Sequence, residues 1–233
     1  MFNTNFSLYV IMLILSLISN VIVVLCIYKK YNLTTDETIG ALVYENIGII
    51  FGAKVLTYLE NTNLYKNFDF LNIGFTSYGA LLGAFICLFI FKKKAKDIYY
   101  TFLPSIPLMY AIGKIGCFLV GCCYGMKYSG PGSIIYNYSS IAPKNTSLFP
   151  VQILETLIFT LIFIYTIKKT IKNRFNNKEL GIFIILCGIS KFLLDFLRMK
   201  TTSNIFSTNQ LLSLVFIFIG IFIFIKYLKE END

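Results

Sequence analysis

Long apolar blocks are the feature that most restricts what this chain can fold into. Of its 233 residues, 56% are hydrophobic and 14% are charged, and the mean hydropathy is +0.70. Each block approaches the roughly 20 residues that a helix needs to cross a bilayer, whereas an outer-membrane barrel would show short alternating segments. The sequence therefore predicts an all-α polytopic membrane protein with seven transmembrane helices, in which residues 1–233 form a single integral membrane domain. The seven blocks lie at about residues 8–28, 39–58, 74–91, 98–121, 149–167, 181–197 and 206–225.

The basic residues predict the orientation of these spans. Thirteen of the 21 lie in the connections after the first, third and fifth blocks and after the last block, and five lie in the other connections. Because cytoplasmic loops are enriched in Lys and Arg, the bias predicts an external N-terminus, a cytoplasmic C-terminus and an external loop at 122–148. Topology and anionic membrane lipids account for the positive charge, so no nucleic-acid partner is expected. The first block has no basic residues ahead of it and no small-residue cleavage site, which predicts a retained span rather than a signal peptide.

The stretch Gly113–Gly125 is unusual for a membrane span. It places a lysine, three cysteines and four glycines where an apolar block ends in a polar loop. A charge inside a span costs a few kcal/mol, and clustered glycines let the backbone approach a neighbour or a cavity. We therefore interpret the stretch as the wall of a site. The chain has no histidine, and three cysteines alone make a poor structural zinc site, so neither a metal nor a cofactor is expected.

Other polar residues inside the apolar blocks are few, and several fall toward the outer half of the membrane in the predicted orientation. Lys191 and Asp195 are four residues apart and can pair on one helical face. Cations that converge in one leaflet suit an anionic lipid headgroup. The alternative is that each lysine reaches the interface or is neutralised by a carboxylate for packing. The set comprises Glu45, Lys54, Lys114, Gln152, Glu155, Lys191 and Asp195, with Arg198 at the outer end of the sixth block.

Several of these residues lie in segments that resemble the bacterial prolipoprotein diacylglyceryl transferases, a family with a seven-span fold. The stretch Gly113–Gly125 resembles the family signature, which begins Gly-Arg-Ile-Gly-Asn-Phe, continues through a Gly-Glu pair and closes with a glycine. The other matching segments follow the family order and are Gly52–Lys54, Tyr78–Gly83, Pro150–Glu155, Ser190–Arg198 and Asn209–Ser213. The resemblance implies structural roles for Gly113, Gly116, Gly121, Gly125, Gln152, Asp195 and Gln210.

The resemblance also implies a function. Members of the family move a diacylglyceryl group from phosphatidylglycerol to the lipobox cysteine of a prolipoprotein, at the outer face of the bacterial plasma membrane. The thiol would attack the glyceryl carbon, and the phosphoglycerol would leave. Cations stabilise such a departing phosphate, and a base is needed to form the thiolate. The resemblance assigns the phosphate to Lys54, Lys114, Lys191 and Arg198, and the base to Tyr78 or Glu155.

The chain also departs from the family pattern. Tyr78 stands where the family has a histidine, and Cys117 and Cys122 stand where the signature has an asparagine and a glutamate. Three arginines of the family are Lys54, Lys114 and Lys191 here, which keep the charge but lose the bidentate fork for phosphate. With a pKa of about 10, a tyrosine is a poor base unless cations depress that pKa.

The cysteines open alternatives to the family reaction. Cys117 or Cys122 could carry the lipid group covalently before passing it on. They could equally be small packing residues, or one of the clustered cysteines could form a disulfide. Two further functions follow: a phospholipid-dependent transferase with another acceptor and a cysteine intermediate, or a non-catalytic membrane protein that binds lipid or senses thiols.

Overall fold

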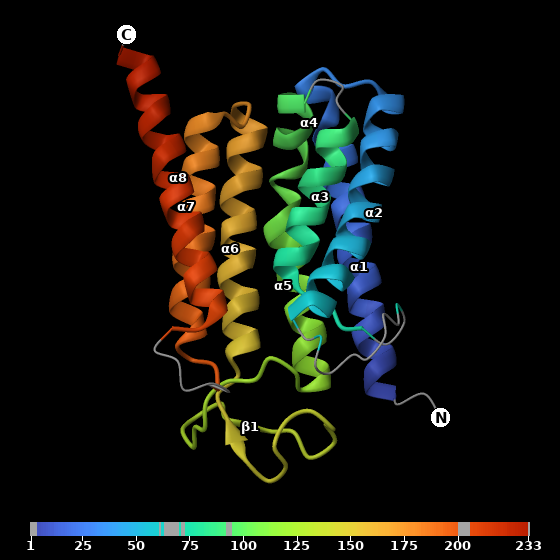
Figure 1. Cartoon of the computed structure of the whole chain (residues 1–233), viewed down its shortest axis with the longest axis vertical. Coiled ribbons are helices and arrows are strands. Elements are labelled where there is room, and N and C mark those ends of the chain that lie inside the picture. Colours follow the sequence, from blue (N-terminus) through green and yellow to red (C-terminus); the bar gives the residue numbers. More distant parts are fainter. Residues whose placement is uncertain are drawn as a thin grey trace. The chain divides into compact units, whose positions relative to one another are not determined.

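The computed structural model describes residues 4–60, 62, 70, 73–91, 95–199 and 206–232 (Figure 1). Five of the basic residues counted for the orientation, Lys66, Lys92, Lys93, Lys94 and Lys200, lie outside these residues. The elements are α1 (Thr4–Ile27), η1 (Tyr28–Tyr31), α2 (Thr35–Glu60), α3 (Ser77–Phe91), α4 (Ala95–Phe102), α5 (Ser105–Val120), β1 (Ile134–Ile135), β2 (Ser147–Leu148), α6 (Val151–Lys172), α7 (Asn177–Asp195) and α8 (Thr208–Asn232).

A helix coincides with each predicted span, although the fourth is divided. A turn at Leu103 and Pro104 separates α4 from α5, because proline has no N–H to continue the helical ladder. Within the described residues, five segments are long and apolar enough to cross a membrane: Leu8–Tyr31, Thr35–Glu60, Lys96–Val120, Val151–Lys172 and Thr208–Glu231. The helix α3 is apolar but shorter, and α7 carries charged residues near both ends. The chain is thus a helical polytopic membrane protein, as predicted.

The chain divides into two compact units, which are described separately. One consists of Val21–Leu103, and the other of Met1–Asn20 together with Pro104–Asp233. In the unit Val21–Leu103, α2 packs along α3 through two glycine pairs. A Cβ added at Gly48 would collide with the carbonyl oxygen of Gly83, and one at Gly52 would collide with that of Gly79. Small residues four apart allow two membrane helices to approach this closely.

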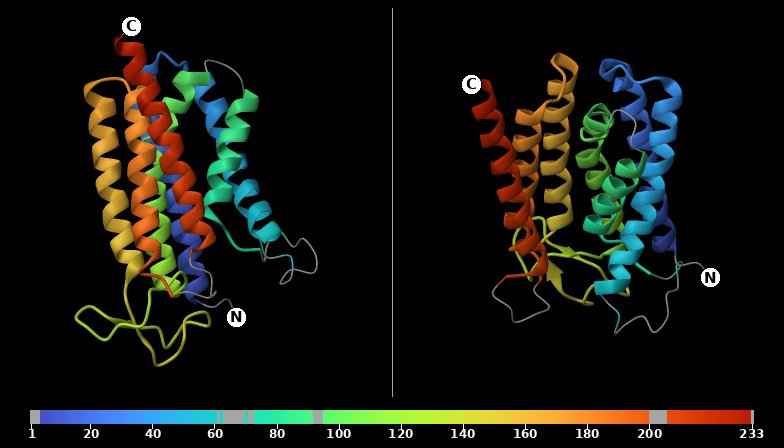
Figure 2. Two further views of the ribbon diagram at one scale, coloured as in Figure 1. Left: turned by 60° about the vertical axis from the view of Figure 1, so that its left-hand side comes forward. Right: turned by 45° about the horizontal axis from the view of Figure 1, so that its top comes forward.

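The other unit holds α5 to α8, with α5 against α6, α6 against α7, and α7 against α8 (Figure 2). Glycines again permit the closest approach. A Cβ at Gly181 would lie 3.0 Å from the carbonyl oxygen of Gly220, and one at Gly188 would lie 3.1 Å from that of Ser213. At the end where α5 stops and α6 starts, the intervening connection covers the helices (Figure 1).

This connection between α5 and α6 has its own small core. The strands β1 and β2 pair antiparallel, with Ile134 opposite Leu148. Tyr136, Ala142 and Leu148 are buried together, and Phe118 at the end of α5 packs against them. The predicted loop is therefore an ordered element that is attached to the helix ends, and it can hold residues there in fixed positions.

We expect Gly83→Leu to destabilise the unit Val21–Leu103. The new side chain has no room against the Gly48 carbonyl oxygen, and overpacking of this kind costs about 1–3 kcal/mol. Thermal unfolding in detergent, followed by circular dichroism, measures the loss. Gly74→Ala is the control, because its Cβ would meet only the Thr57 methyl group at 3.6 Å. Equal melting temperatures for the two variants would contradict the packing described here.

Candidate functional site

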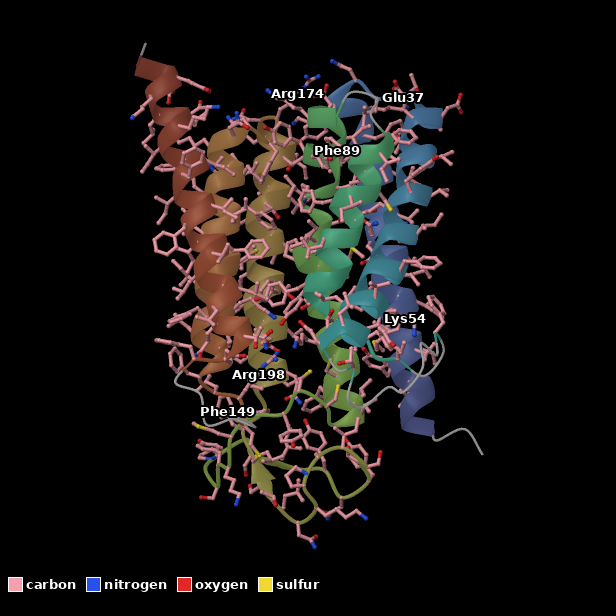
Figure 3. All side chains as sticks on the ribbon, in the orientation of Figure 1. Glu37, Lys54, Phe89, Phe149, Arg174 and Arg198 are labelled. Atoms are coloured by element: carbon pink, nitrogen blue, oxygen red, sulfur yellow. The ribbon has the colours of Figure 1, made fainter. Side chains whose placement is uncertain are left out.

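The carboxylate of Glu155 is the centre of a buried charge cluster. Glu155 lies in the first turns of α6 and is 1% exposed. Its Oε2 is 2.8 Å from the Lys114 ammonium of α5, and its Oε1 is 2.6 Å from Arg198 Nη2, just after α7. An unpaired charge at such a depth would be costly, so each ion pair stabilises both of its members. Three segments that are distant in sequence are thereby joined at one carboxylate. Figure 3 shows Arg198 close to Phe149 and the α5–α6 connection.

Tyr110 extends this cluster to a third cation. Its hydroxyl donates to Glu155 Oε1 at 3.0 Å and accepts from the Lys191 ammonium at 2.9 Å. The ammonium nitrogens of Lys114 and Lys191 also lie 5.1 and 4.6 Å from the centre of its ring. Sequence reasoning missed Tyr110, although it lies one helical turn before Lys114 and therefore shares its face. Three cations thus surround one carboxylate, and the cluster carries excess positive charge.

A short backbone ladder holds Arg198 in place. The Met126 N–H donates to the Leu197 carbonyl at 2.8 Å, and the Phe149 N–H donates to the Met126 carbonyl at 2.9 Å. Gly125 pairs with Arg198 in the same ladder, where a Cβ would collide with the Phe149 carbonyl oxygen. The last glycine of the signature therefore serves a close backbone approach. The Arg198 Nε–H is buried and has no hydrogen-bond partner among the described residues, so it can donate a hydrogen bond to an oxygen atom of a ligand.

Other residues of the matched segments join the helices to the connections. The Gln152 side chain, which is fully buried, donates to the Cys122 carbonyl at 2.8 Å. Asp195 accepts hydrogen bonds from Ser207 and Asn209, and Gln210 accepts one from the Ser207 N–H at 2.9 Å. These contacts tie the end of α7 to the start of α8.

The remaining signature glycines have different surroundings. A Cβ at Gly116 would lie 3.0 Å from Met12 and 3.2 Å from Tyr9 of α1, so this glycine permits close helix packing. At Gly113, beside Lys114, an added Cβ would meet nothing within 4 Å. In the α5–α6 connection, burial raises the pKa of the Tyr136 hydroxyl, which keeps it a neutral neighbour of Gln152.

Lys54 and Tyr78 belong to the unit Val21–Leu103. The Lys54 ammonium donates to the Ile73 carbonyl at 2.8 Å and lies 4.9 and 4.6 Å from the ring centres of Phe70 and Phe75. It therefore ties α2 to the segment that precedes α3. Tyr78 is half-buried in the first turn of α3.

The three clustered cysteines meet at the end of α5. The sulfur atoms of Cys117, Cys122 and Cys123 all lie within 4.8 Å of one another, and all three are free thiols. The structure thus brings together Lys114, Glu155, Lys191 and Arg198, with this thiol group beside them.

The comparison with known proteins matches the chain to the family of prolipoprotein diacylglyceryl transferases over residues 1–226. The chain belongs to this family. It is 31% identical to a phosphatidylglycerol–prolipoprotein diacylglyceryl transferase of Clostridium tetani over 209 residues, which cover 84% of this chain and 83% of that protein. A similarly named enzyme of Finegoldia magna is 25% identical over 240 residues, which cover 98% and 94% of the two chains.

Another relative is the second phosphatidylglycerol–prolipoprotein diacylglyceryl transferase of Clostridium perfringens, which is 28% identical over 219 residues. The match covers 88% of this chain and 84% of that protein. Family membership therefore rests on nearly the whole chain, including every residue of the charge cluster.

For this family member, we expect Glu155→Ala to cost much more stability than the loss of an exposed carboxylate. Removal of Glu155 leaves Lys114 and Arg198 buried without their shared counter-charge, at a cost of about 3–5 kcal/mol. Glu230→Gln removes the exposed pair with Lys226 and should cost less than about 1 kcal/mol. Thermal unfolding in detergent compares the two. If Glu155→Ala does not fold, Glu155→Gln gives the same comparison, and equal effects at both positions would contradict the role of Glu155.

Proposed function

We infer that this chain transfers a diacylglyceryl group from phosphatidylglycerol to the thiol of a prolipoprotein lipobox cysteine. The observation that carries the inference is the excess of buried positive charge around Glu155, in a chain of the prolipoprotein diacylglyceryl transferase family. Phosphatidylglycerol has an anionic phosphodiester, and the departing phosphoglycerol carries still more negative charge. A preorganised cation cluster with little access to water stabilises that developing charge more strongly than water does.

The cluster supports separate roles for its members. Lys114, Arg198 and Lys191 bind the phosphate, with the unpaired Arg198 Nε as an additional donor. Glu155 positions these cations, because both of its oxygens are already in contact with them. Glu155 is therefore a poor candidate for the general base. Tyr78 remains as the other candidate base that the family resemblance implied. We retain Lys54 as a phosphate ligand, although its contacts with Ile73, Phe70 and Phe75 also suit a packing role.

The orientation in the plasma membrane is part of the same proposal. Seven spans, with the N-terminus outside and the C-terminus in the cytoplasm, place residues 122–148 at the outer face. In Figure 1 the α5–α6 connection and the C-terminus lie at opposite ends of their unit, which supports this arrangement. The lipobox peptide would then reach the charge cluster from the outer surface.

Reporter fusions test the orientation. Alkaline phosphatase, which folds only outside the cytoplasm, should be active when inserted at the turn at Gly132 and inactive when fused after Asp233. A fluorescent protein that folds in the cytoplasm should give the reverse pattern. The same reporter active at both positions would contradict either the number of spans or their direction.

Lys114→Ala should abolish most of the transferase activity. The loss of one preorganised donor to a developing charge costs about 10²-fold or more in rate. The assay follows labelled diacylglycerol from phosphatidylglycerol vesicles to a synthetic lipobox peptide. Lys114→Arg should retain activity, because arginine keeps the charge and adds a guanidinium group that can bind phosphate through two N–H donors. Lys127→Ala, which removes an exposed cation of the loop, is the control.

Undiminished transfer by a folded Lys114→Ala variant would contradict the site assignment. A separate test asks whether the gene restores growth to a bacterial strain that lacks its lipoprotein transferase. Failure there, together with no phosphatidylglycerol turnover in vitro, would favour a non-catalytic lipid-binding protein. Turnover of the lipid without transfer to the lipobox peptide would point to a different acceptor.

A further inference from the structure

The thiols of Cys117, Cys122 and Cys123 form a cluster that the phosphate-binding role leaves unused. Their three sulfur atoms lie within 4.8 Å of one another. Cys117 is buried, Cys122 is partly exposed and Cys123 is exposed, so part of the cluster lies at the protein surface. Among the described residues, it is the one group of three or more cysteine or carboxylate side chains whose spacing suits a metal ion.

The backbone explains why the sulfurs meet. The helix α5 ends in a Schellman motif, in which the Cys122 N–H donates to the Cys117 carbonyl at 3.0 Å and the Gly121 N–H donates to the Phe118 carbonyl at 3.3 Å. Gly121 has the positive φ of 75° that the motif requires. This motif brings the side chains at its two ends into contact, and here both of them are thiols.

Cys123 completes the cluster from an unusual backbone conformation. Its φ is +52°, a left-handed conformation that costs a residue other than glycine about 1 kcal/mol or more. The chain immediately after it enters the ladder that holds Arg198, through the Met126 N–H. The third sulfur is therefore placed by the same tertiary contacts that build the charge cluster.

The geometry favours a metal over the other uses of three thiols. A disulfide uses only two cysteines, so it would not account for the third thiol of the cluster. Simple packing does not explain an exposed thiol beside two others. In tetrahedral zinc sites, Zn–S bonds of about 2.3 Å put the sulfurs about 3.8 Å apart, which small side-chain rotations can reach from the present spacing.

A three-cysteine site differs from the closed structural zinc site that the sequence argued against. Structural zinc has four protein ligands, whereas catalytic zinc has three and keeps an open fourth position. The chain has no histidine, and the nearby Glu155 is held by Lys114 and Arg198, so the fourth position is left for a substrate. Lys114 and Arg198 also interact electrostatically with Cys123, and their charge offsets that of a three-thiolate zinc centre.

We propose that Cys117, Cys122 and Cys123 bind one Zn²⁺ ion, whose open position takes the acceptor cysteine thiol. This inference rests on the proposed transfer of a diacylglyceryl group to a thiol. Such a transfer requires a thiolate, and a thiol that coordinates zinc is deprotonated outright. Zinc thus activates the acceptor thiol without relying on Tyr78, the remaining candidate base, in a chain with no histidine.

The step is balanced without any oxidant or reductant. The acceptor thiol gives its proton to water as its sulfur binds zinc. A sulfur electron pair then forms the bond to the glyceryl carbon, and the carbon–oxygen bond to the phosphate breaks with its electrons on oxygen. The phosphoglycerol leaves beside Lys114 and Arg198 and takes up a proton from water. The thioether is a weaker ligand than the thiolate, so the product dissociates and the zinc is unchanged.

Metal analysis of the purified full-length protein in detergent tests this site without any activity assay. After dialysis against zinc, the wild-type protein should retain about one zinc ion per chain. Cobalt(II) in its place should give the near-ultraviolet thiolate charge-transfer bands of a tetrahedral sulfur site. Cys123→Ser should weaken zinc binding by more than about 10-fold, because it removes a direct ligand.

Matched controls exclude general effects of losing a cysteine. Cys187→Ser and Cys87→Ser change thiols of the membrane helices α7 and α3 and should leave zinc binding unchanged. If Cys123→Ser does not fold, Cys122→Ser tests the same ligand set. A wild-type chain with no bound zinc and no cobalt thiolate bands would overturn the site, as would a Cys117–Cys122 disulfide found by mass spectrometry.

The outcomes separate this inference from the proposed function. Full transfer to the lipobox peptide by a chain that binds no zinc would overturn the metal site and leave the function standing. Zinc bound by a chain that transfers nothing would overturn the proposed function and, with it, the role of the metal in activating the acceptor. A diacylglyceryl group found on Cys117 or Cys122 would overturn the inference in favour of a covalent carrier.

Discussion

Glu155 is a carboxylate buried in a membrane helix, and the arrangement of the site depends on it. It contacts Lys114 of α5 and Arg198 after α7 directly, and Lys191 of α7 through the Tyr110 hydroxyl. Each of these charges would be costly to bury alone. Together they form a cluster in which each charged side chain contacts another member and positive charge remains in excess. That excess is what makes the cluster suited to an anionic phospholipid rather than to packing alone.

The α5–α6 connection holds the side chains of this cluster in fixed positions. The ladder from Gly125 and Met126 to Leu197 fixes the backbone on which Arg198 sits. Gln152 joins the same connection to α6, three residues before Glu155. A phosphate-binding arginine is useful only when its position is held before the ligand arrives. An ordered connection with its own core, at the end of the helices, meets that requirement better than a mobile loop would.

Much of the fold was predictable, because hydropathy and helix termination are local properties. The predicted span at 98–121 consists of two helices separated at Pro104. A proline in the sequence is enough to indicate such a break, because it has no backbone N–H to donate. Lys114 and Lys191 could also be picked out, since a charge inside an apolar block is rare, and Arg198 could be picked out from the family resemblance. Tyr110 was not picked out, because a tyrosine in a span is ordinary until its hydroxyl is seen between Lys191 and Glu155.

The sequence by itself determined where the apolar helices lie, which connections carry the positive charge and which ionisable residues are buried. Each of these follows from a short window of residues and its free energy of transfer into lipid. Only the tertiary structure decided that Glu155 is shared by Lys114 and Arg198, and that Cys123 joins Cys117 and Cys122 beside them. These residues are separated by up to tens of positions in the sequence. Helix packing and the backbone ladder of the α5–α6 connection bring them together, and a short window of sequence does not contain that information.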